Sequence, residues 1–210
     1  MLGLAILIPA YNEEKNIKNV LSKLQKYNVY LINDGSNDKT FDIAQKFTNV
    51  KISNNKINLG YENSLIKGFN IILKKNFKYI LTIDADGEHS LNKIKQFCKF
   101  AIQTDSDLVV GKRSKFNRVS EKIVSFFFKI RFKISDPLSG FKLYKTSTLK
   151  KIIHNIKDDN TFLVKILFIF LKKNCNVQNF DIVVNKRYGS RVGNSLSTNI
   201  KIIKLISYII

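Results

Sequence analysis

Two aspartates separated by one residue, Asp84 and Asp86, follow directly on the apolar segment 79–83. Residues two apart on an extended backbone point to the same side, so both carboxylates can face one cation. In proteins, Mg²⁺ is commonly held by a few carboxylates together with the phosphates of a substrate. The spacing therefore predicts a divalent-cation site. The alternative is an ordinary Asp-Gly turn with a capping aspartate.

Three further polar clusters also come directly after apolar runs. They cover residues 9–14, 33–40 and 111–113, and the aspartate cluster covers residues 84–89. Turns after strands are usually polar, so one such cluster alone is a weak signal. The carboxyl ends of parallel strands meet at one edge of a sheet, and α/β proteins bind their ligands there. Four clusters together predict a binding site at that edge.

The segments that carry these clusters alternate between two periodicities. Short apolar runs at 4–8, 29–32, 50–53, 79–83 and 108–110 are typical of buried strands. Between them, apolar residues recur at helical spacing over 17–24, 41–47, 65–73 and 91–101, and Asn12 is placed to cap the first of these helices. The alternation predicts an α/β fold of three layers, with a mostly parallel central sheet between two layers of helices.

The second half of the chain has a different rhythm. Residues 119–134 combine phenylalanines with interspersed lysines and arginines; strands are expected at 141–144 and 177–184, and an apolar helix at 162–171. The 119–134 segment could lie at a bilayer surface with its apolar face down, or it could be a core helix with a solvated basic face. The amphipathic tail, 197–210, leaves a similar choice between a membrane interface and a cover for the core.

Length and composition narrow the class of protein. The 210 residues, of which 44% are hydrophobic, fit one domain with a substantial core and exclude a disordered chain. A formal net charge of +20 favours anionic partners such as nucleic acid, acidic lipid or phosphorylated substrates, although lysines that only decorate solvated faces give the same charge. No membrane-spanning segment or signal peptide is evident. Two distant cysteines, Cys98 and Cys175, suit a reducing compartment.

Three motifs, taken in order, resemble the family 2 glycosyltransferases: IPAYNEE at 8–14, NDGS at 33–36 and DADGEH at 84–89. The resemblance implies a GT-A fold, which is Rossmann-like, a nucleotide-sugar donor and inversion at the anomeric carbon. Later motifs are similar to the branch that contains dolichyl-phosphate mannosyltransferases and bacterial polyprenyl-phosphate glycosyltransferases: GKR at 111–113, DPLSGF at 136–141 and RVGNS at 191–195.

The resemblance covers residues 4–196 and implies one catalytic domain over 1–210. We expect residues 4–113 to bind the nucleotide sugar, residues 114–196 to form the acceptor side, and residues 197–210 to form the amphipathic tail.

The resemblance also implies roles for single residues. Those that would hold the nucleotide are Pro9, Tyr11, Asn12, Glu13 and Asp34, with Asp84 against the ribose or a metal. Those that would hold Mg²⁺ or Mn²⁺ are Asp84, Asp86 and Glu88, the last in place of a common glutamine. Those that would face the phosphates of donor or acceptor are Arg113, Arg118, Arg191 and Ser195, although Leu196 replaces the lysine that usually follows this serine.

The transfer reaction itself indicates which catalytic groups the site needs. Departure of a nucleoside diphosphate develops negative charge on the leaving phosphate, which a divalent metal and fixed guanidinium groups stabilise. A phosphate acceptor is already ionised and needs no general base, whereas a sugar hydroxyl needs one. Asp136 is the candidate base, although the proline and glycine that follow it also fit a turn that it caps. The expected catalytic residues are thus Asp86, Arg113, Asp136 and Arg191.

These observations predict an inverting, metal-dependent hexosyltransferase that moves a sugar from a GDP- or UDP-sugar to a polyprenyl phosphate at the cytoplasmic face of an anionic membrane. The alternative in the same class is transfer to a saccharide hydroxyl in cell-surface glycan assembly. Glu88 and Leu196 leave open a non-catalytic homologue. Only the charge favours a nucleic-acid-binding protein, and because no such module is recognisable, we expect no nucleic-acid partner.

Overall fold

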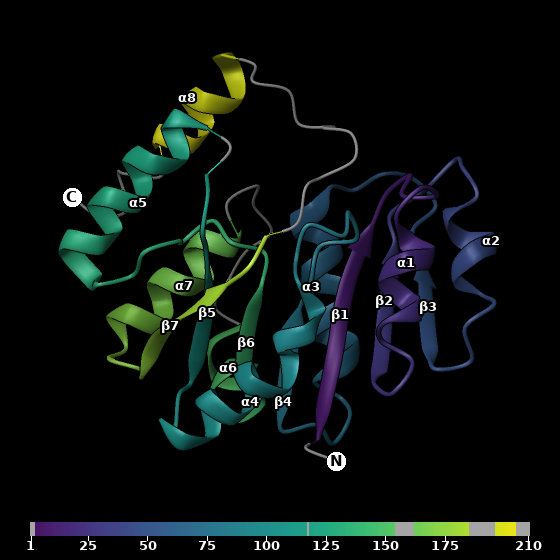
Figure 1. The fold of residues 1–210 in the computed structure, drawn as a ribbon, viewed down its shortest axis with the longest axis horizontal. Coiled ribbons are helices and arrows are strands. Elements are labelled where there is room, and N and C mark those ends of the chain that lie inside the picture. Colours follow the sequence, from purple (N-terminus) through teal and green to yellow (C-terminus); the bar gives the residue numbers. More distant parts are fainter. Residues whose placement is uncertain (1–2, 117, 154–161, 185–195, 205–210) are drawn as a thin grey trace.

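The computed structural model describes residues 3–116, 118–153, 162–184 and 196–204, and its strands form one seven-stranded sheet in the order β3-β2-β1-β4-β6-β5-β7 (Figure 1). The strands are β1 (Leu4–Ala10), β2 (Asn28–Asn33), β3 (Val50–Asn54), β4 (Tyr79–Thr82), β5 (Leu108–Arg113), β6 (Lys142–Lys145) and β7 (Val177–Ile182). The helices are α1 (Ile17–Ser22), α2 (Thr40–Ala44), α3 (Tyr61–Ile72), α4 (Ile94–Gln103, after a 3₁₀ turn at Leu91–Lys93), α5 (Val119–Phe132), α6 (Thr146–Ile153), α7 (Phe162–Lys172) and α8 (Leu196–Lys204).

Strand β6 runs antiparallel between β4 and β5, whereas the other neighbouring strands pair in parallel. The prediction of a mostly parallel sheet is confirmed, but the sequence did not predict where β6 lies. Because β4 and β5 point the same way, β1, β2, β4 and β5 all end at one edge of the sheet, the upper edge in Figure 1. Strand β6 begins at that same edge, so the chain that leads into it also reaches the predicted binding site.

Hydrophobic side chains form a separate core on each face of the sheet. Along β1, Ala5 and Leu7 face one core, whereas Leu4, Ile6 and Ile8 face the other. The first core is covered by α3, α5, α6 and α7, and the second by α1, α2 and α4. A sheet covered on both faces explains why its strands read as continuous apolar runs. The three-layer prediction is confirmed.

Helices α5 and α8 lie side by side beyond the upper edge of the sheet (Figure 1), and Ser120 Oγ donates a hydrogen bond to Asn199 Oδ1 at 2.5 Å. The α5 side chains Val124 and Phe128 are buried in the core. Within the described ranges no helix is long and apolar enough to cross a membrane; α5, the longest, has 14 residues.

The outer face of α5 is apolar as well as basic. Phe126 and Ile130 are 60% and 68% exposed, and Ile123 and Phe127 are also exposed. One face of the helix therefore packs in the core, whereas contact of its exposed apolar face with a bilayer stays a prediction. In α8, Ile202 packs against the core; residues 205–210 of the predicted tail lie outside the described residues.

Two local expectations are wrong. Asn12 does not cap the first helix, because α1 begins at Ile17 after Asn16. Instead, Asn12 Oδ1 accepts a hydrogen bond from the Asn37 backbone N–H at 2.7 Å, and the Asn12 N–H donates to Ser36 Oγ at 2.9 Å. Asn12 thus ties the loop after β1 to the loop after β2. Helix α6 was not expected, because its short apolar pattern follows β6 without an intervening turn.

Helix α3 approaches β1 closely at Gly68, which lies against Leu7. A Cβ atom on Gly68 would overlap Leu7 Cδ1 and lie 2.8 Å from Leu7 Cδ2. We expect Gly68→Ala to lower the free energy of unfolding by about 1–3 kcal/mol, as added methyl groups do in packed cores. Urea unfolding of the variant measures this loss.

A double variant gives the control for this contact. Leu7→Ala alone should cost about 2–5 kcal/mol, because it leaves a cavity. In the Gly68→Ala background the added methyl group occupies part of that cavity, so the double variant should lose less than the sum of the two single losses. Simple additivity would show that the two side chains do not compete for the same space.

Candidate active site

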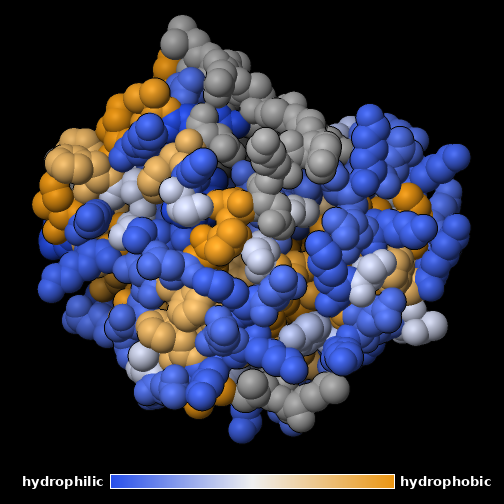
Figure 2. Space-filling view, in the orientation of Figure 1, coloured by the Kyte–Doolittle hydropathy of each residue, from blue (hydrophilic) through white to orange (hydrophobic). Residues whose placement is uncertain are grey.

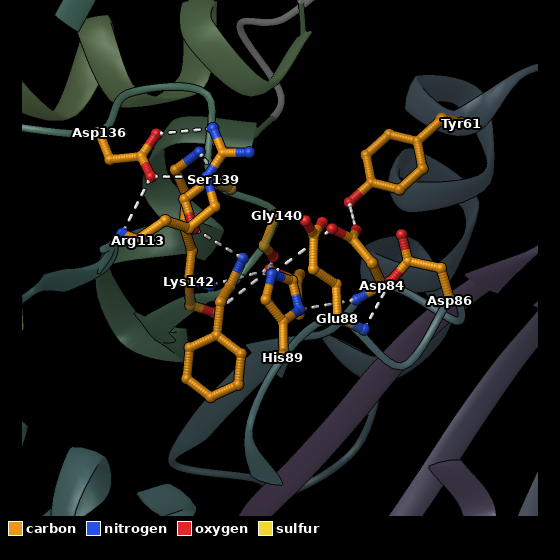
Figure 3. Close-up of polar contacts among 12 residues, drawn as sticks. Tyr61, Asp84, Asp86, Glu88, His89, Arg113, Asp136, Ser139, Gly140 and Lys142 are labelled. Atoms are coloured by element: carbon orange, nitrogen blue, oxygen red, sulfur yellow. Dashed lines mark hydrogen bonds and ion pairs between the residues drawn. The ribbon is translucent and has the colours of Figure 1, made fainter. Parts of the chain in front are cut away.

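The loops after β1, β2, β4 and β5 and the loop before β6 come together at the upper edge of the sheet. The predicted residues divide into a nucleotide side after β1 and β2, an acidic loop after β4, and a cationic side formed by β5 and the start of α5. Figure 3 shows the acidic loop facing the cationic side, with residues 139–142 between them.

Asp84, just beyond the end of β4, is held by its neighbours. Asp84 Oδ1 accepts a hydrogen bond from the Tyr61 hydroxyl at 2.7 Å, and Asp84 Oδ2 lies 3.6 Å from His89 Nε2 (Figure 3). The Asp84 backbone N–H donates to His89 Nδ1 at 3.4 Å. A Cβ atom on Gly140 would lie 2.5 Å from Asp84 Oδ2, so only glycine fits beside this carboxylate. The protein alone therefore fixes the position of Asp84.

Tyr61 was not predicted as a site residue, because a tyrosine at the start of a helix carries no signal of its own. Burial, followed by the negative charge of Asp84, raises the pKa of Tyr61 well above its ordinary value. The Tyr61 hydroxyl therefore stays protonated at neutral pH and continues to donate to Asp84. His89 is buried, and its ring packs edge-to-face against that of Phe141, with 5.1 Å between the two ring centroids.

Asp86 and Glu88 lie on the turn that follows Asp84. The Glu88 backbone N–H donates to Asp86 Oδ1 at 3.0 Å, and both residues are half-buried. Among the residues that the structure describes, no three His, Cys, Asp or Glu side chains form a group that could hold a metal ion. The protein alone thus does not assemble the expected set of Asp84, Asp86 and Glu88. Asp86 with a single neighbour still fits Mg²⁺, which is commonly bound by one or two carboxylates and substrate phosphates.

The residues expected to hold the nucleotide lie together where β1 and β2 end: Pro9, Tyr11, Asn12, Glu13 and Asp34. Pro9 belongs to β1 and pairs with Ile32 of β2. The Glu13 backbone N–H donates to Thr40 Oγ1 at 2.6 Å, which joins the two loops a second time.

Asp34 is buried, and its carboxylate binds the protein itself. Asp34 Oδ1 accepts hydrogen bonds from Asn55 Nδ2 at 2.7 Å and from the Leu59 N–H at 2.9 Å, and Asp34 Oδ2 accepts one from the Gly60 N–H at 2.9 Å. These bonds hold the loop that leads into α3. In this structure Asp34 shapes the nucleotide side, and its direct contact with a nucleotide stays a prediction.

On the cationic side, Arg113 at the end of β5 is paired with Asp136 (Figure 3). Arg113 Nε donates to Asp136 Oδ2 at 2.7 Å, Arg113 Nη2 donates to Asp136 Oδ1 at 3.1 Å, and the Arg113 backbone N–H donates to Asp136 Oδ2 at 3.1 Å. Burial alone would lower the pKa of Arg113, but the hydrogen bond and charge of Asp136, and then the charge of Glu121, outweigh it and raise that pKa. Arg113 is therefore a permanent cation in the site.

Glu121 in the first turn of α5 connects two arginines. Its Oε2 lies 3.3 Å from Arg113 Nη2, and its Oε1 accepts a hydrogen bond from Arg118 Nη1 at 2.7 Å. The structure thus brings Arg113 and Arg118 together through a buried carboxylate that was not predicted. The signal for Glu121 was its place as the sole acidic residue of a basic helix.

Lys142, the first residue of β6, is the third residue that the sequence analysis missed, after Tyr61 and Glu121. It is fully buried, and its Nζ donates to the Pro137 carbonyl oxygen at 2.9 Å and to the Ser139 carbonyl oxygen at 2.7 Å. The available signal was a lysine between Phe141 and Leu143, inside a strand expected to be buried. Two predicted site residues, Arg191 and Ser195, lie outside the described residues.

Comparison with known proteins identifies the family. The family model described as Glycosyl transferase family 2 matches residues 5–167. The uncharacterized protein MJ1222 of Methanocaldococcus jannaschii is 28% identical over 220 residues, which cover 96% of this chain and 90% of that protein. The UDP-N-acetylglucosamine–dolichyl-phosphate N-acetylglucosaminyltransferase of Methanococcus voltae is 27% identical over 203 residues, which cover 80% of each chain.

The fold is also similar to a solved structure, glucosyl-3-phosphoglycerate synthase from Mycobacterium tuberculosis in complex with Mn²⁺, UDP and phosphoglyceric acid. The TM-score is 0.77 at 14% sequence identity, and the match covers 98% of this chain and 78% of that one. This likeness confirms the GT-A fold. Because the family model spans most of the chain, including the acidic loop and Asp136, the chain belongs to the family 2 glycosyltransferases.

Proposed function

We propose that this protein transfers a sugar from a nucleoside diphosphate sugar to a polyprenyl phosphate, using Mg²⁺ or Mn²⁺, while it is bound peripherally at the cytoplasmic face of a membrane. The dolichyl-phosphate transferase of Methanococcus voltae, by its name, uses a UDP-sugar and a lipid phosphate, which supports this choice.

One observation carries the proposal. Arg113 and Arg118 both contact Glu121 in the first turn of α5. The same helix presents exposed apolar side chains at Val119, Phe126 and Ile130. A polyprenyl phosphate has an anionic head and a hydrocarbon chain, so it needs cationic donors next to an apolar surface. The contacts of Arg113 with Asp136 and Glu121 use Nε and Nη2, and we assign its Nη1 to the acceptor phosphate.

The state of Asp136 favours a phosphate acceptor over a sugar hydroxyl. A general base has to reach the proton that it removes. Asp136 is fully buried, and both of its carboxylate oxygens accept hydrogen bonds from Arg113. It is therefore suited to hold Arg113 in place, whereas the proton of an acceptor hydroxyl is out of its reach. An ionised phosphate needs no such base.

The chain's own residues would act as follows. Asp86, with Asp84 or Glu88, would hold the metal, which when bound would neutralise the leaving diphosphate. Tyr61 and His89 keep the Asp84 carboxylate in position. An oxygen of the acceptor phosphate would form the new bond to the anomeric carbon as the bond to the nucleoside diphosphate breaks, with inversion at that carbon.

A donor screen tests this function. The protein is incubated with GDP- or UDP-sugars, a polyprenyl phosphate and Mg²⁺ or Mn²⁺, and the lipid-linked sugar is separated and its anomeric configuration determined. We expect one donor to give an inverted sugar-phosphate lipid. Transfer only to saccharide hydroxyls would support the alternative acceptor, and the absence of transfer from every donor would contradict the proposal.

Membrane binding through the exposed face of α5 gives a separate prediction. Figure 2 shows apolar side chains gathered beside blue, hydrophilic ones on the part of the surface where α5 lies in Figure 1. We expect the double variant Phe126→Ser/Ile130→Ser to bind anionic vesicles at least about tenfold more weakly, because each buried apolar side chain contributes about 1.5–3 kcal/mol. Flotation with vesicles of phosphatidylglycerol and phosphatidylcholine measures this.

The control is a substitution of an exposed isoleucine that does not belong to α5. Ile102 of α4 is 44% exposed, and α4 covers the opposite face of the sheet. Ile102→Ser should bind the vesicles as the unchanged protein does. Equal losses in both variants, or no loss in either, would show that α5 is not the surface that meets the lipid.

A further inference from the structure

Burial of Lys142 costs solvation free energy. A lysine ammonium group loses its hydration when it is fully buried, and such groups are retained only where hydrogen bonds or opposite charges compensate. Burial lowers the pKa of Lys142 to about 8, although the charge of Asp136 partly opposes the shift. Among the described residues, no carboxylate lies within ion-pair distance of Lys142 Nζ, and its partners are the carbonyl oxygens of Pro137 and Ser139.

These two carbonyl groups belong to the loop that joins the halves of the site. At one end of the loop, Asp136 accepts three hydrogen bonds from Arg113. At the other end, Gly140 lies directly against the carboxylate of Asp84 (Figure 3). The position of this short loop therefore sets the distance between the metal-side carboxylate and the phosphate-side guanidinium.

Two side chains under the loop hold it in place. Lys142 Nζ donates to the carbonyl oxygens of Pro137 and Ser139 in the middle of the loop. Thr82 Oγ1 donates to the carbonyl oxygen of Gly140 at 2.6 Å. Both Lys142 and Thr82 are fully buried and come from adjacent strands, β6 and β4, which are paired at Thr82 and Lys142. A purely structural role could be filled by an apolar side chain, which would avoid the buried charge.

We propose that Lys142 is a positioning residue, which binds the carbonyl oxygens of Pro137 and Ser139 and thereby holds Asp136 against Arg113 and Gly140 against Asp84. Lys142 contacts neither substrate nor metal in this role. Its expected effect on the rate of transfer rests on the proposed function, whereas its expected effect on Arg113 does not.

The test compares Lys142→Met with Lys142→Arg. Methionine has a similar length but no hydrogen-bond donor, whereas arginine keeps the charge and the donors. The first readout is solvent exchange of the Arg113 Nε–H proton, followed by NMR without any substrate and assigned by its disappearance in Arg113→Lys. In Lys142→Met we expect this proton to exchange at least about tenfold faster, because its bond to Asp136 opens more often; Lys142→Arg should restore slow exchange.

The second readout is kinetic. We expect Lys142→Met to lower kcat for the transfer by about 10- to 100-fold, the range typical of residues that orient other site residues, with a much smaller change in the KM for the donor. Lys142→Arg should recover most of the rate. If Arg113 exchange accelerates but no donor supports transfer in the unchanged protein, the proposed function fails while the positioning role stands.

Two controls complete the design. Lys145→Met removes a lysine from the same strand whose Nζ binds exposed Asp105 at 2.8 Å, and it should alter neither readout. If Lys142→Met does not fold, Thr82→Val carries the test. It removes the second support of the loop, together with the longer 3.3 Å contacts of Thr82 Oγ1 with the Lys142 backbone, and should show the same changes to a smaller extent. Unchanged exchange of the Arg113 proton in Lys142→Met, or in Thr82→Val if only that variant folds, would overturn the proposal.

Discussion

Asp86→Ala is expected to slow sugar transfer by at least about 10²-fold, because it weakens the binding of the metal that would offset the negative charge developing on the leaving diphosphate. Asp86 lies on the turn after Asp84, and its Oδ1 accepts the Glu88 N–H at 3.0 Å, so the carboxylate is oriented by the backbone. Without it, we expect the site to lose its principal ligand for Mg²⁺ or Mn²⁺. Initial rates at saturating donor and acceptor measure the loss, and Mn²⁺ titration followed by electron paramagnetic resonance measures the affinity for the metal.

Metal removal and a distant aspartate provide the controls. EDTA should reduce the rate of the unchanged protein to a similar extent, and added Mg²⁺ or Mn²⁺ should restore it, whereas EDTA should change Asp86→Ala little further. Asp105→Asn alters an exposed carboxylate that binds Lys145 and should leave the rate unchanged. Full activity in Asp86→Ala, or unaltered Mn²⁺ affinity, would remove Asp86 from the proposed metal site.

Asp136→Ala is expected to lower the free energy of unfolding by about 3–5 kcal/mol, because it removes the main partner of a buried guanidinium and leaves Arg113 only its 3.3 Å contact with Glu121. The side chain of Asp136 is fully buried, and that of Arg113 is 10% exposed, so water cannot replace the lost carboxylate. Urea unfolding at neutral pH, followed by circular dichroism, measures the change.

An exposed ion pair between β5 and β7 serves as the comparison for this loss of stability. Asp181 lies 2.9 Å from Lys112 Nζ with its side chain 80% exposed. Asp181→Ala should cost less than about 1 kcal/mol, because solvent screens exposed pairs. The double variant Arg113→Met/Asp136→Leu should regain much of the loss, since apolar replacement removes both buried charges. A loss in Asp136→Ala no larger than in Asp181→Ala would mean that Glu121 alone compensates the charge of Arg113.

The layers of the fold could be predicted because the relevant signals are local. A strand that is covered on both faces reads as a continuous apolar run, as residues 4–8 do, and each following helix shows its own period. The position of β6 could not be predicted in this way. Residues 141–144 have the pattern of a strand, but their place between β4 and β5 depends on distant contacts such as that of Thr82 with Gly140.

The same distinction separates the site residues that were found from those that were missed. Asp84 and Asp86 stand two apart in one loop, so their spacing alone indicated a shared role. Arg113 and Asp136 were predicted separately, but their pairing joins residues 23 positions apart. The sequence marks Lys142 as unusual, since it interrupts a buried strand, yet only the folded loop shows which carbonyl groups it binds.

The antiparallel direction of β6 has a consequence for how acceptor preference can change. Strand β5 ends, and β6 begins, at the same edge of the sheet. The segment 114–141, which includes α5, therefore connects the two strands at that edge. Exchanging this segment for the corresponding stretch of another family member would replace α5, the helix that we propose faces the lipid, together with Asp136, and it would leave the order of the strands unchanged. The half of the molecule built on β1, β2 and β3 would keep its own connections through such an exchange.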